Sequence, residues 1–343
     1  MNRETQPLVS VITPAYNCAE YLAECLESLL SQTYQNWECT IVNNCSADRS
    51  ADIAREYAAK DPRIRLHENQ EFLKAVPNFN AGMRLISPRS TYCKLLFADD
   101  WIFPECLERM VEVAEEHPSV GIVGAYGLQG RQVMWAGLPY PSRLVSGREI
   151  CRRLFLEDLY VFGTGTSLLF RSDLVRGRDP FFNESNLHAD SEACLAMLQN
   201  CDFGFVNQVL TFTRVRPGSL FAFSTQVNTL IAGRLYDLVT FGPRFLTTQE
   251  FQQCLGRKLS EYYEFLAGSL GRRKGKKFWD YHQKKLEEAG VGFDRTRLAL
   301  AFLAKVADAL GNPKRTFARL LGPKPALRDP NFLPGFQENT QTR

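Results

Sequence analysis

The chain has 343 residues, 45% of them hydrophobic, which is enough for one large domain with a sizeable core and a second, smaller one. Its net charge of +3 is unevenly distributed: residues 1–222 hold 21 Lys and Arg against 27 Asp and Glu (−6), and residues 223–343 hold 20 against 11 (+9). The basic second part fits an anionic partner or surface, or equally an ordinary solvated surface, and no nucleic-acid partner is expected.

Cysteine usage and hydropathy exclude several classes of protein. The ten cysteines are scattered without a C-x-x-C pair, which indicates small buried hydrophobes in a reducing compartment, and neither a disulfide framework nor a zinc site. The polar stretch Met1–Pro7 predicts no signal peptide. The apolar run Leu298–Leu310 is interrupted by Lys305 and Asp308, so no membrane span is predicted. We therefore expect a cytoplasmic protein.

The first hundred residues alternate short apolar strands with amphipathic helices. Asn17 with Glu20 is close to a capping box for the first helix, along which apolar residues recur at helical spacing. Near-continuous apolar strands linked in this way indicate a parallel sheet covered on both faces, with right-handed crossovers. The strands are expected at residues 8–13, 39–43, 63–67 and 92–97, and the helices at 18–30, 53–58 and 78–86.

Further elements of the same kind follow, and the pattern then changes near Phe223. Up to that point, helices are expected at residues 104–114, 149–156 and 191–198, and strands at 121–126, 166–170 and 203–215. Beyond it, the segments 226–241, 248–270, 275–289 and 296–321 are long and helix-compatible. We therefore predict an α/β domain over residues 1–222, a basic helical region over 223–322 and a disordered tail over 323–343.

Polar residues follow three of the expected parallel strands, at Pro14–Asn17, Asn43–Ser46 and Asp99–Asp100. Each could be a turn, and the two acids could cap the next helix. Their meeting at one sheet edge predicts a binding site, because ligands of open α/β sheets bind beyond the carboxyl ends of the strands. Paired carboxylates there suit a divalent cation. G-x-G-x-x-G, P-loop, G-x-S-x-G and H-E-x-x-H motifs are absent from the sequence.

Four stretches in register resemble the family 2 inverting glycosyltransferases of the GT-A fold: Val9–Asn17 (VSVITPAYN), Ser31–Tyr34 (SQTY), Val42–Asp48 (VNNCSAD) and Phe97–Asp100 (FADD). The resemblance is strong over residues 7–110, moderate over 160–220 and absent beyond about 225. It implies a Rossmann-type mixed α/β sheet with helices on both faces, here followed by a C-terminal helical region. It also implies transfer of a hexose-type sugar from a nucleoside-diphosphate donor to a hydroxyl of a saccharide, lipid-linked or protein-linked acceptor, in surface polysaccharide or glycoconjugate synthesis.

The resemblance implies a role for each polar strand end. Ala15 and Tyr16 would line the base and ribose, and Asn44 would face the edge of the nucleobase. Asp99 would contact the ribose and, with Asp100, would hold Mn²⁺ or Mg²⁺ against the diphosphate, where the metal stabilises the leaving nucleotide as a Lewis acid. Further contacts to the nucleotide-sugar donor are implied for Pro14, Lys74 and Asn80, with surface solvation and helix polarity as the alternatives for the last two.

On the acceptor side, the stretch His188–Glu192 resembles the acidic motif at the start of the acceptor-side helix. Asp190 would be the general base that takes the proton of the attacking hydroxyl, and one base without a second acidic nucleophile implies inversion. The alternative is an N-cap aspartate, and the two roles can coexist. Gly163–Ser167 resembles the flexible acceptor loop.

Three departures from the family pattern leave an alternative open. Asn43 and Asn44 stand where two aspartates are usual, Phe97 replaces the first acid of the D-x-D-D form, and Arg216 replaces a histidine that is sometimes a metal ligand. Arg216 cannot bind a metal, but it could contact the diphosphate directly. The alternative function is a catalytically silent sugar-nucleotide-binding protein. A nucleotidyltransferase is disfavoured because no Gly- and Arg-rich loop follows the first strand.

The basic run Arg272–Lys277 places five cations in six positions. Such a run can hold a protein reversibly at an anionic membrane, since each cation near the surface contributes about 1 kcal/mol. A solvated helix end and a subunit contact are the alternatives. The expected location is therefore cytoplasmic, with peripheral membrane contact as the finer hypothesis.

Overall fold

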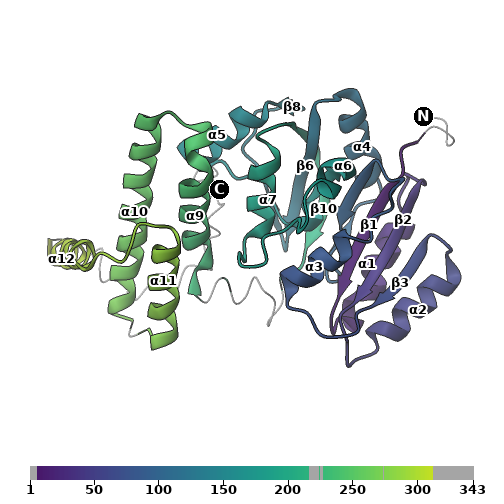
Figure 1. The fold of residues 1–343 in the computed structure, drawn as a ribbon, viewed down its shortest axis with the longest axis horizontal. Helices are drawn as coiled ribbons and strands as arrows, with labels where there is room; N and C mark the ends of the chain where they lie inside the picture. Colours follow the sequence, from purple (N-terminus) through teal and green to yellow (C-terminus); the bar gives the residue numbers. More distant parts are fainter. Residues whose placement is uncertain (1–5, 216–223, 225–226, 273, 312–343) are drawn as a thin grey trace, which may run out of the picture. The chain divides into compact units, whose positions relative to one another are not determined.

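The computed structural model describes residues 6–215, 224, 227–272 and 274–311 (Figure 1). The chain divides into two compact units, Met1–Gln226 and Val227–Arg343, and each contains its own hydrophobic cluster. The functional division at residue 222 stays a prediction, and the expected disordered tail, 323–343, lies outside the described residues.

The first half of the sheet in the first unit is parallel. β1 pairs with β2 on one side and with β4 on the other, and β2 pairs with β3. All seven residues of β1 are buried, as its continuous apolar pattern predicts for a strand covered on both faces. These strands are β1 (Val9–Ala15), β2 (Trp37–Asn43), β3 (Ile64–Glu68) and β4 (Tyr92–Leu95), and the helices between them are α1 (Ala19–Leu30), α2 (Ser50–Lys60) and α3 (Ala75–Met83).

The second half of the sheet is mixed. β9 runs antiparallel to both β4 and β6, whereas β10 is parallel to β6 and antiparallel to the short β5 and β8. The strand order β3-β2-β1-β4-β9-β6-β10-β5 confirms the expected mixed α/β sheet. These strands are β5 (Trp101–Ile102), β6 (Val120–Gln129), β7 (Gln132–Met134), which pairs with β6, β8 (Leu144–Val145), β9 (Leu168–Arg171) and β10 (Asp202–Thr213).

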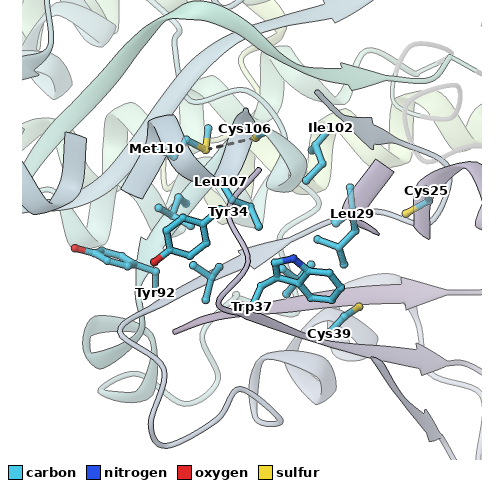
Figure 2. Close-up of a cluster of buried hydrophobic side chains, with 14 of the residues drawn as sticks. Cys25, Leu29, Tyr34, Trp37, Cys39, Tyr92, Ile102, Cys106, Leu107 and Met110 are labelled. Atoms are coloured by element: carbon cyan, nitrogen blue, oxygen red, sulfur yellow. Dashed lines mark hydrogen bonds between the residues drawn. The ribbon is translucent and has the colours of Figure 1, made fainter. Parts of the chain in front are cut away.

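A buried cluster lies between the sheet, α1 and α4 (Cys106–Glu116), and in Figure 2 it holds Leu29 of α1, Trp37 of β2 and Leu107 of α4. Eight of the ten cysteines are buried, as predicted, whereas Cys45 is exposed and Cys201 is half-buried, so the prediction was wrong for these two. Burial raises the pKa of the Cys39 thiol to about 12, so this sulfur is inert. The remaining helices of the unit are α5 (Gly147–Glu157), the 3-10 turn η2 (Gly165–Ser167), α6 (Ser172–Arg176) and α7 (Ala189–Met197).

The start of α1 differs from the sequence prediction. Asn17 does not cap the helix: it has a left-handed backbone (φ 46°), and the residue before the helix is Cys18. The first backbone amides of α1 are instead satisfied by side chains that follow β2. Asp48 Oδ2 accepts from Ala19 N at 3.0 Å, and Ser50 Oγ accepts from Cys18 N at 2.8 Å. The capping-box prediction was therefore wrong because side chains about thirty residues away supply the cap.

The second unit is helical, as its sequence predicts. Its cluster includes Tyr262, Phe278 and Leu286, and it surrounds the fully buried His282. The ring of His282 lies 2.7 Å from the Tyr262 hydroxyl and 2.9 Å from the Val227 carbonyl, and burial lowers its pKa to about 4. None of the described helices combines the length and the hydropathy that crossing a bilayer requires. The helices are α9 (Thr229–Phe245), α10 (Thr248–Leu270), α11 (Lys276–Glu288) and α12 (Arg295–Gly311).

Candidate functional site

The turns after β1 and β2 are joined to each other at the carboxyl edge of the sheet. Ala15 O accepts from Asn44 N at 2.8 Å, and Asn17 N donates to Ser46 Oγ at 3.1 Å. The parallel register of β1 and β4 brings the turn after β4, which carries the two aspartates, to the same edge. Three polar strand ends that are separated in the sequence therefore lie together, as we expected from their positions.

The carboxylate of Asp100 is buried at this edge. Its Oδ2 accepts from the Thr166 hydroxyl at 2.7 Å, and its Oδ1 accepts from Arg214 N at 2.9 Å. Burial, together with the neighbouring charge of Asp99, raises the pKa of Asp100 to about 7, although the two hydrogen bonds oppose the shift. The chain thus maintains a carboxyl group that titrates near neutral pH and whose ionised form a bound positive charge would stabilise.

Arg214, the residue after β10, forms hydrogen bonds to both aspartates. Its Nε donates to Asp99 O at 2.9 Å, its guanidinium forms an ion pair with Glu24, and the same group lies 4.8 Å from the centre of the Tyr21 ring. The sequence drew attention to Arg216, which lies outside the described residues. Arg214 belongs to the same motif but was not predicted to contact the aspartates, because its partners lie more than one hundred residues away.

Lys94 is a second residue that the sequence analysis missed. It is completely buried in β4, and its Nζ donates to the carbonyls of Thr166 (2.5 Å) and Leu168 (3.1 Å). Burial lowers the pKa of this amine. The available signal was a lone lysine within the apolar run Tyr92–Phe97. Lys94 fixes the turn η2 and so holds the Thr166 hydroxyl against Asp100.

The two aspartates fit the oxygen chemistry of a divalent cation. Asp99 is half-buried beside the buried Asp100, and each Asp100 oxygen keeps a lone pair after accepting one hydrogen bond. Among the described residues, no three His, Cys, Asp or Glu side chains gather at one point. The protein would therefore supply only part of the coordination shell, as is usual for Mg²⁺ held by one or two carboxylates and substrate phosphates.

An exposed pair of aromatic side chains lies close to the ends of β1 and of the loop before α3. Tyr16 follows β1, Phe72 precedes α3, and their ring centres are 4.9 Å apart. About half of each side chain is exposed (46% and 56%), which is unusual for aromatic rings and typical of binding surfaces. Pro14 and Ala15, in contrast, are buried within β1 and shape the edge from beneath.

Asn44 positions this aromatic pair through the main chain. Its Nδ2 donates to Leu73 O at 2.7 Å, and its Oδ1 accepts from Leu73 N and from the Asn69 side chain, both at 2.9 Å. Three of the four hydrogen bonds that an amide can form are thus made within the protein. Asn44 therefore holds the loop that carries Phe72, and its contact with the nucleobase stays a prediction. Lys74, the residue before α3, is exposed at the end of that loop.

Asn80 forms its hydrogen bonds within the protein, and its contact with the nucleotide-sugar donor stays a prediction. Its buried amide donates to Phe182 O and accepts from Phe182 N, both at 2.8 Å, and donates to Glu184 at 3.0 Å. Asn80 therefore ties α3 to the segment that leads toward α7. Glu192 holds the same segment from the other side, by accepting from Asn183 and Asn186 at 2.8 to 3.2 Å.

Asp190 lies in the first turn of α7, where a carboxylate accepts from the main chain at Ser191 N (2.8 Å). Burial raises its pKa to about 6, against these main-chain hydrogen bonds. The Ser191 hydroxyl lies 2.9 Å from the Tyr160 hydroxyl, which donates to Gly163 O at 3.0 Å. The predicted base is thus linked to the segment 160–167, which also contacts the carboxylate pair.

The segment 160–167 is fixed by close packing. Gly163 has φ +74°, and a Cβ there would lie 2.5 Å from the Ser167 Cβ, so glycine is required. A Cβ at Gly165 would lie 3.0 Å from Phe97 Cζ, and the Phe97 ring packs on Phe79 at 5.0 Å. The ring of Phe97, which stands where the family pattern has a further acid, therefore packs on an aromatic neighbour.

Several known proteins are similar to this chain in sequence. Residues 10–176 match the model of Glycosyl transferase family 2. The "Putative glycosyltransferase EpsE" of Bacillus subtilis (strain 168) is 33% identical over 153 residues, which cover 42% of this chain and 54% of that protein. The chain spans about half the length of this relative and about a third of the next two, so it corresponds to only part of each.

Two solved structures share the fold. TarS 1-349 of S. aureus, in complex with UDP-GlcNAc, superposes with a TM-score of 0.64 and 14% identity, covering 90% of this chain and 92% of that one. The mannosyltransferase PcManGT of Pyrobaculum calidifontis, in complex with GDP-Man and Mn²⁺, has a TM-score of 0.54 and 17% identity, covering 93% and 85%. At such low identity the likeness shows the fold alone, and it confirms the GT-A expectation.

Proposed function

We propose that the chain is a glycosyltransferase of family 2, whose model matches residues 10–176, and that it transfers a sugar from a nucleoside-diphosphate donor to an acceptor hydroxyl. We propose that the transfer inverts the anomeric centre and serves surface polysaccharide or glycoconjugate synthesis. The observation that carries the proposal is the pair of the half-buried Asp99 and the buried Asp100 at the carboxyl edge of the sheet, linked to Asp190 through the segment 160–167.

The carboxylate pair would hold the diphosphate end of the donor. Asp99 and Asp100 are the residues that would bind Mn²⁺ or Mg²⁺, which supplies a positive charge to the departing diphosphate. The mannosyltransferase of the same fold was solved with Mn²⁺, which supports a divalent metal here. Thr166 and Arg214 keep the Asp100 carboxylate fixed in one orientation, so that no reorganisation is needed when charge develops. Arg216 remains a proposed contact to the diphosphate.

Tyr16 and Phe72 would provide the apolar surface for the base and ribose. Asn44 holds the Phe72 loop by its main chain, so we assign Asn44 a positioning role in addition to the predicted contact. Asn80 takes a positioning role for the same reason, and the exposed Lys74 remains a proposed contact. The neighbours of the same fold were solved with UDP-GlcNAc and GDP-Man, two different nucleotides, so the base is left to experiment.

Asp190 would act as the general base on the acceptor side. A carboxyl group with a pKa of about 6 is mostly ionised at neutral pH and yet basic enough to accept a proton efficiently. The base would deprotonate the acceptor hydroxyl as that hydroxyl attacks the anomeric carbon from the face opposite the nucleotide. A single displacement of this kind inverts the configuration.

The proposal can be tested with a panel of UDP-, GDP- and dTDP-sugars, with and without Mn²⁺, measured first by thermal shift and then by release of nucleoside diphosphate. A donor at one hundred times its dissociation constant stabilises the folded chain by about 2.7 kcal/mol. We expect one nucleotide class to raise the melting temperature and to be turned over. A stabilising donor without hydrolysis or transfer would support the silent binding protein, and no stabilisation by any donor would contradict both functions.

A further inference from the structure

α12 carries several large apolar side chains that are exposed in the structure. Leu303 and Leu310 are 62% and 77% exposed, and Phe302 and Val306 are also exposed. At 100° per residue, these four positions fall within an arc of about 100° on one side of the helix. We call this surface the α12 stripe. A contiguous apolar stripe of this kind marks an interaction surface more often than an isolated exposed leucine does.

The stripe is distinct from the face by which α12 is attached to its own unit. Leu298 and Ala301 pack against the cluster of the second unit and are only partly exposed. Lys305 lies on the same attached face, with its Nζ 3.5 Å from the place where a Cβ on Gly268 of α10 would stand. The attached face lies beside the stripe on the helix, so α12 can remain on α10 while the stripe meets a partner.

Cations are frequent in the sequence of α12 and of the residues that follow it. Residues 295–328 hold eight Lys and Arg and one Asp, a net charge of +7, and residues 309–328 hold five cations and no acid. The basic run Arg272–Lys277 is also close to α12, because Gly268, which lies near Lys305, is only four residues, or about 6 Å along a helix, before Arg272. Among its described cations, Arg272, Lys276 and Lys277 are exposed, and Lys276 pairs with Asp280 at 2.6 Å.

We propose that the α12 stripe is a docking surface for an anionic lipid bilayer, on which α12 lies in the plane of the interface. An apolar stripe beside dense positive charge is the pattern of helices that bury one face at the headgroup boundary and attract anionic lipids. Each cation that reaches the surface strengthens binding about fivefold. The contact that we propose is peripheral and reversible, since one helix face and a group of cations hold the protein at the surface.

Charge selects this occupant over a second copy of the chain. Two copies joined through their stripes would bring two α12 helices of like charge together, each with Arg295, Arg297 and Lys305 against Asp308, and like charges that approach each other oppose association. A bilayer containing acidic lipids supplies the opposite charge over a wide area. The proposal does not depend on the transferase activity, because it uses only residues of the second unit.

The test is co-sedimentation of the full chain with phosphatidylcholine vesicles that do or do not contain phosphatidylglycerol, at low and high salt. The stripe variant is Leu303→Gln with Leu310→Gln. We expect its partition into acidic vesicles to fall at least tenfold, since burial of each leucine in an apolar phase is worth about that factor. The matched control is Leu300→Gln, which has the same 62% exposure as Leu303 but lies outside the stripe. It should change partition by less than about threefold.

Further variants and controls separate the possible outcomes. Changing Lys314, Arg315 and Arg319 to Gln should weaken binding to acidic vesicles only, and high salt should do the same. All substituted leucines are exposed, so melting temperatures should stay unchanged. The proposal is overturned if wild type ignores acidic vesicles, or if the stripe variant and the control bind equally. It is also overturned if the stripe variant dissociates a dimer in sedimentation without changing vesicle binding.

Discussion

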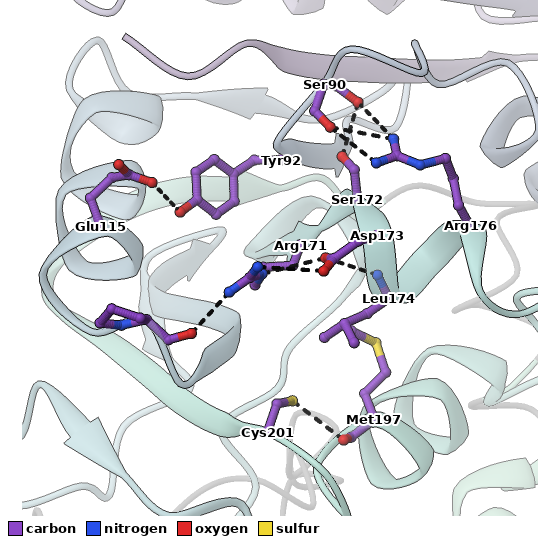
Figure 3. Close-up of polar contacts among 11 residues, drawn as sticks. Ser90, Tyr92, Glu115, Arg171, Ser172, Asp173, Leu174, Arg176, Met197 and Cys201 are labelled. Atoms are coloured by element: carbon purple, nitrogen blue, oxygen red, sulfur yellow. Dashed lines mark hydrogen bonds and ion pairs between the residues drawn. The ribbon is translucent and has the colours of Figure 1, made fainter. Parts of the chain in front are cut away.

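At the edge where β4 begins and β9 ends, cations bind partners within the protein, mostly carbonyls, although Arg171 also pairs with Asp173 at 3.4 Å (Figure 3). Arg176 donates to the carbonyls of Ser87 (3.0 Å) and Ser90 (3.3 Å), and Arg171 donates to Pro118 O at 2.9 Å. The candidate site differs, because burial has moved the pKa values of two of its acids toward neutrality, to about 7 for Asp100, after the opposite end of β4, and to about 6 for Asp190 in α7. The first arrangement connects loops, whereas the second maintains negative charge that a ligand can neutralise.

This comparison separates stability from function. A polar group that is fully satisfied inside the protein mainly stabilises the fold, and its loss should be felt in unfolding. A buried acid with a raised pKa costs the protein stability in its ionised form, so such groups tend to occur at functional sites. Substitutions at the two ends should therefore have opposite signatures, and four measurements can break or sharpen the distinction.

The largest effect is expected for Asp190→Asn. The amide cannot accept the proton of the acceptor hydroxyl, so turnover should fall about a thousandfold, within the usual range for loss of a general base. The dissociation constant of the donor should change less than about threefold, because Asp190 acts on the acceptor. Single-turnover transfer and donor titration would measure both. Equal loss of donor binding would instead make Asp190 a structural residue, like those at the opposite end of the sheet.

A smaller loss, about a hundredfold in transfer, is expected for Asp100→Asn. Asparagine can still accept from Arg214 N and can donate to the Thr166 hydroxyl, so the melting temperature should hold while the negative charge disappears. Wild-type activity should vanish in excess EDTA and return with Mn²⁺ or Mg²⁺. Full activity of the wild type in EDTA would reject the metal role of the pair.

The opposite signature is expected for Arg176→Met. It removes hydrogen bonds to two carbonyls and should lower the free energy of unfolding by about 1–2 kcal/mol, with KM and kcat within about twofold of wild type. Arg89→Met, another exposed arginine of the neighbouring loop, is the control and should stay within about 0.5 kcal/mol. Urea unfolding and steady-state kinetics would test the pair. If the change in kcat/KM, expressed as a free energy, exceeded the loss of unfolding free energy, the two ends would not differ in role.

The parallel half of the sheet was predictable because long apolar runs and helical periodicity are local signals. The strands β5, β7 and β8 were missed because each has only two or three residues, and β5 pairs with β10 more than a hundred residues away. In the candidate site, sequence placed Asp99, Asp100 and Asp190, whose motifs are local. It could not reveal that Lys94 and Thr166 support Asp100, since these contacts join residues 66 to 72 positions apart.

The smallest effect, and the one that discriminates most finely, is the pH dependence of turnover. Burial raises the pKa of Asp190 from 3.8 to about 6, and only the ionised carboxylate can accept a proton. At saturating donor and metal, kcat should therefore be constant above about pH 7 and fall to roughly a tenth of that value at pH 5. Arg176→Met should retain the same acid limb, because its partners are carbonyls. Asp100 provides the competing explanation, since its carboxyl also titrates near neutrality. Protons and a divalent cation would compete for Asp100, so a limb that it controls would move to lower pH as the metal concentration rises. A limb controlled by Asp190 would not move, and it would disappear from the residual activity of Asp190→Asn. An acid limb that shifts with metal would therefore assign the titration to the carboxylate pair and would leave Asp190 without its expected signature.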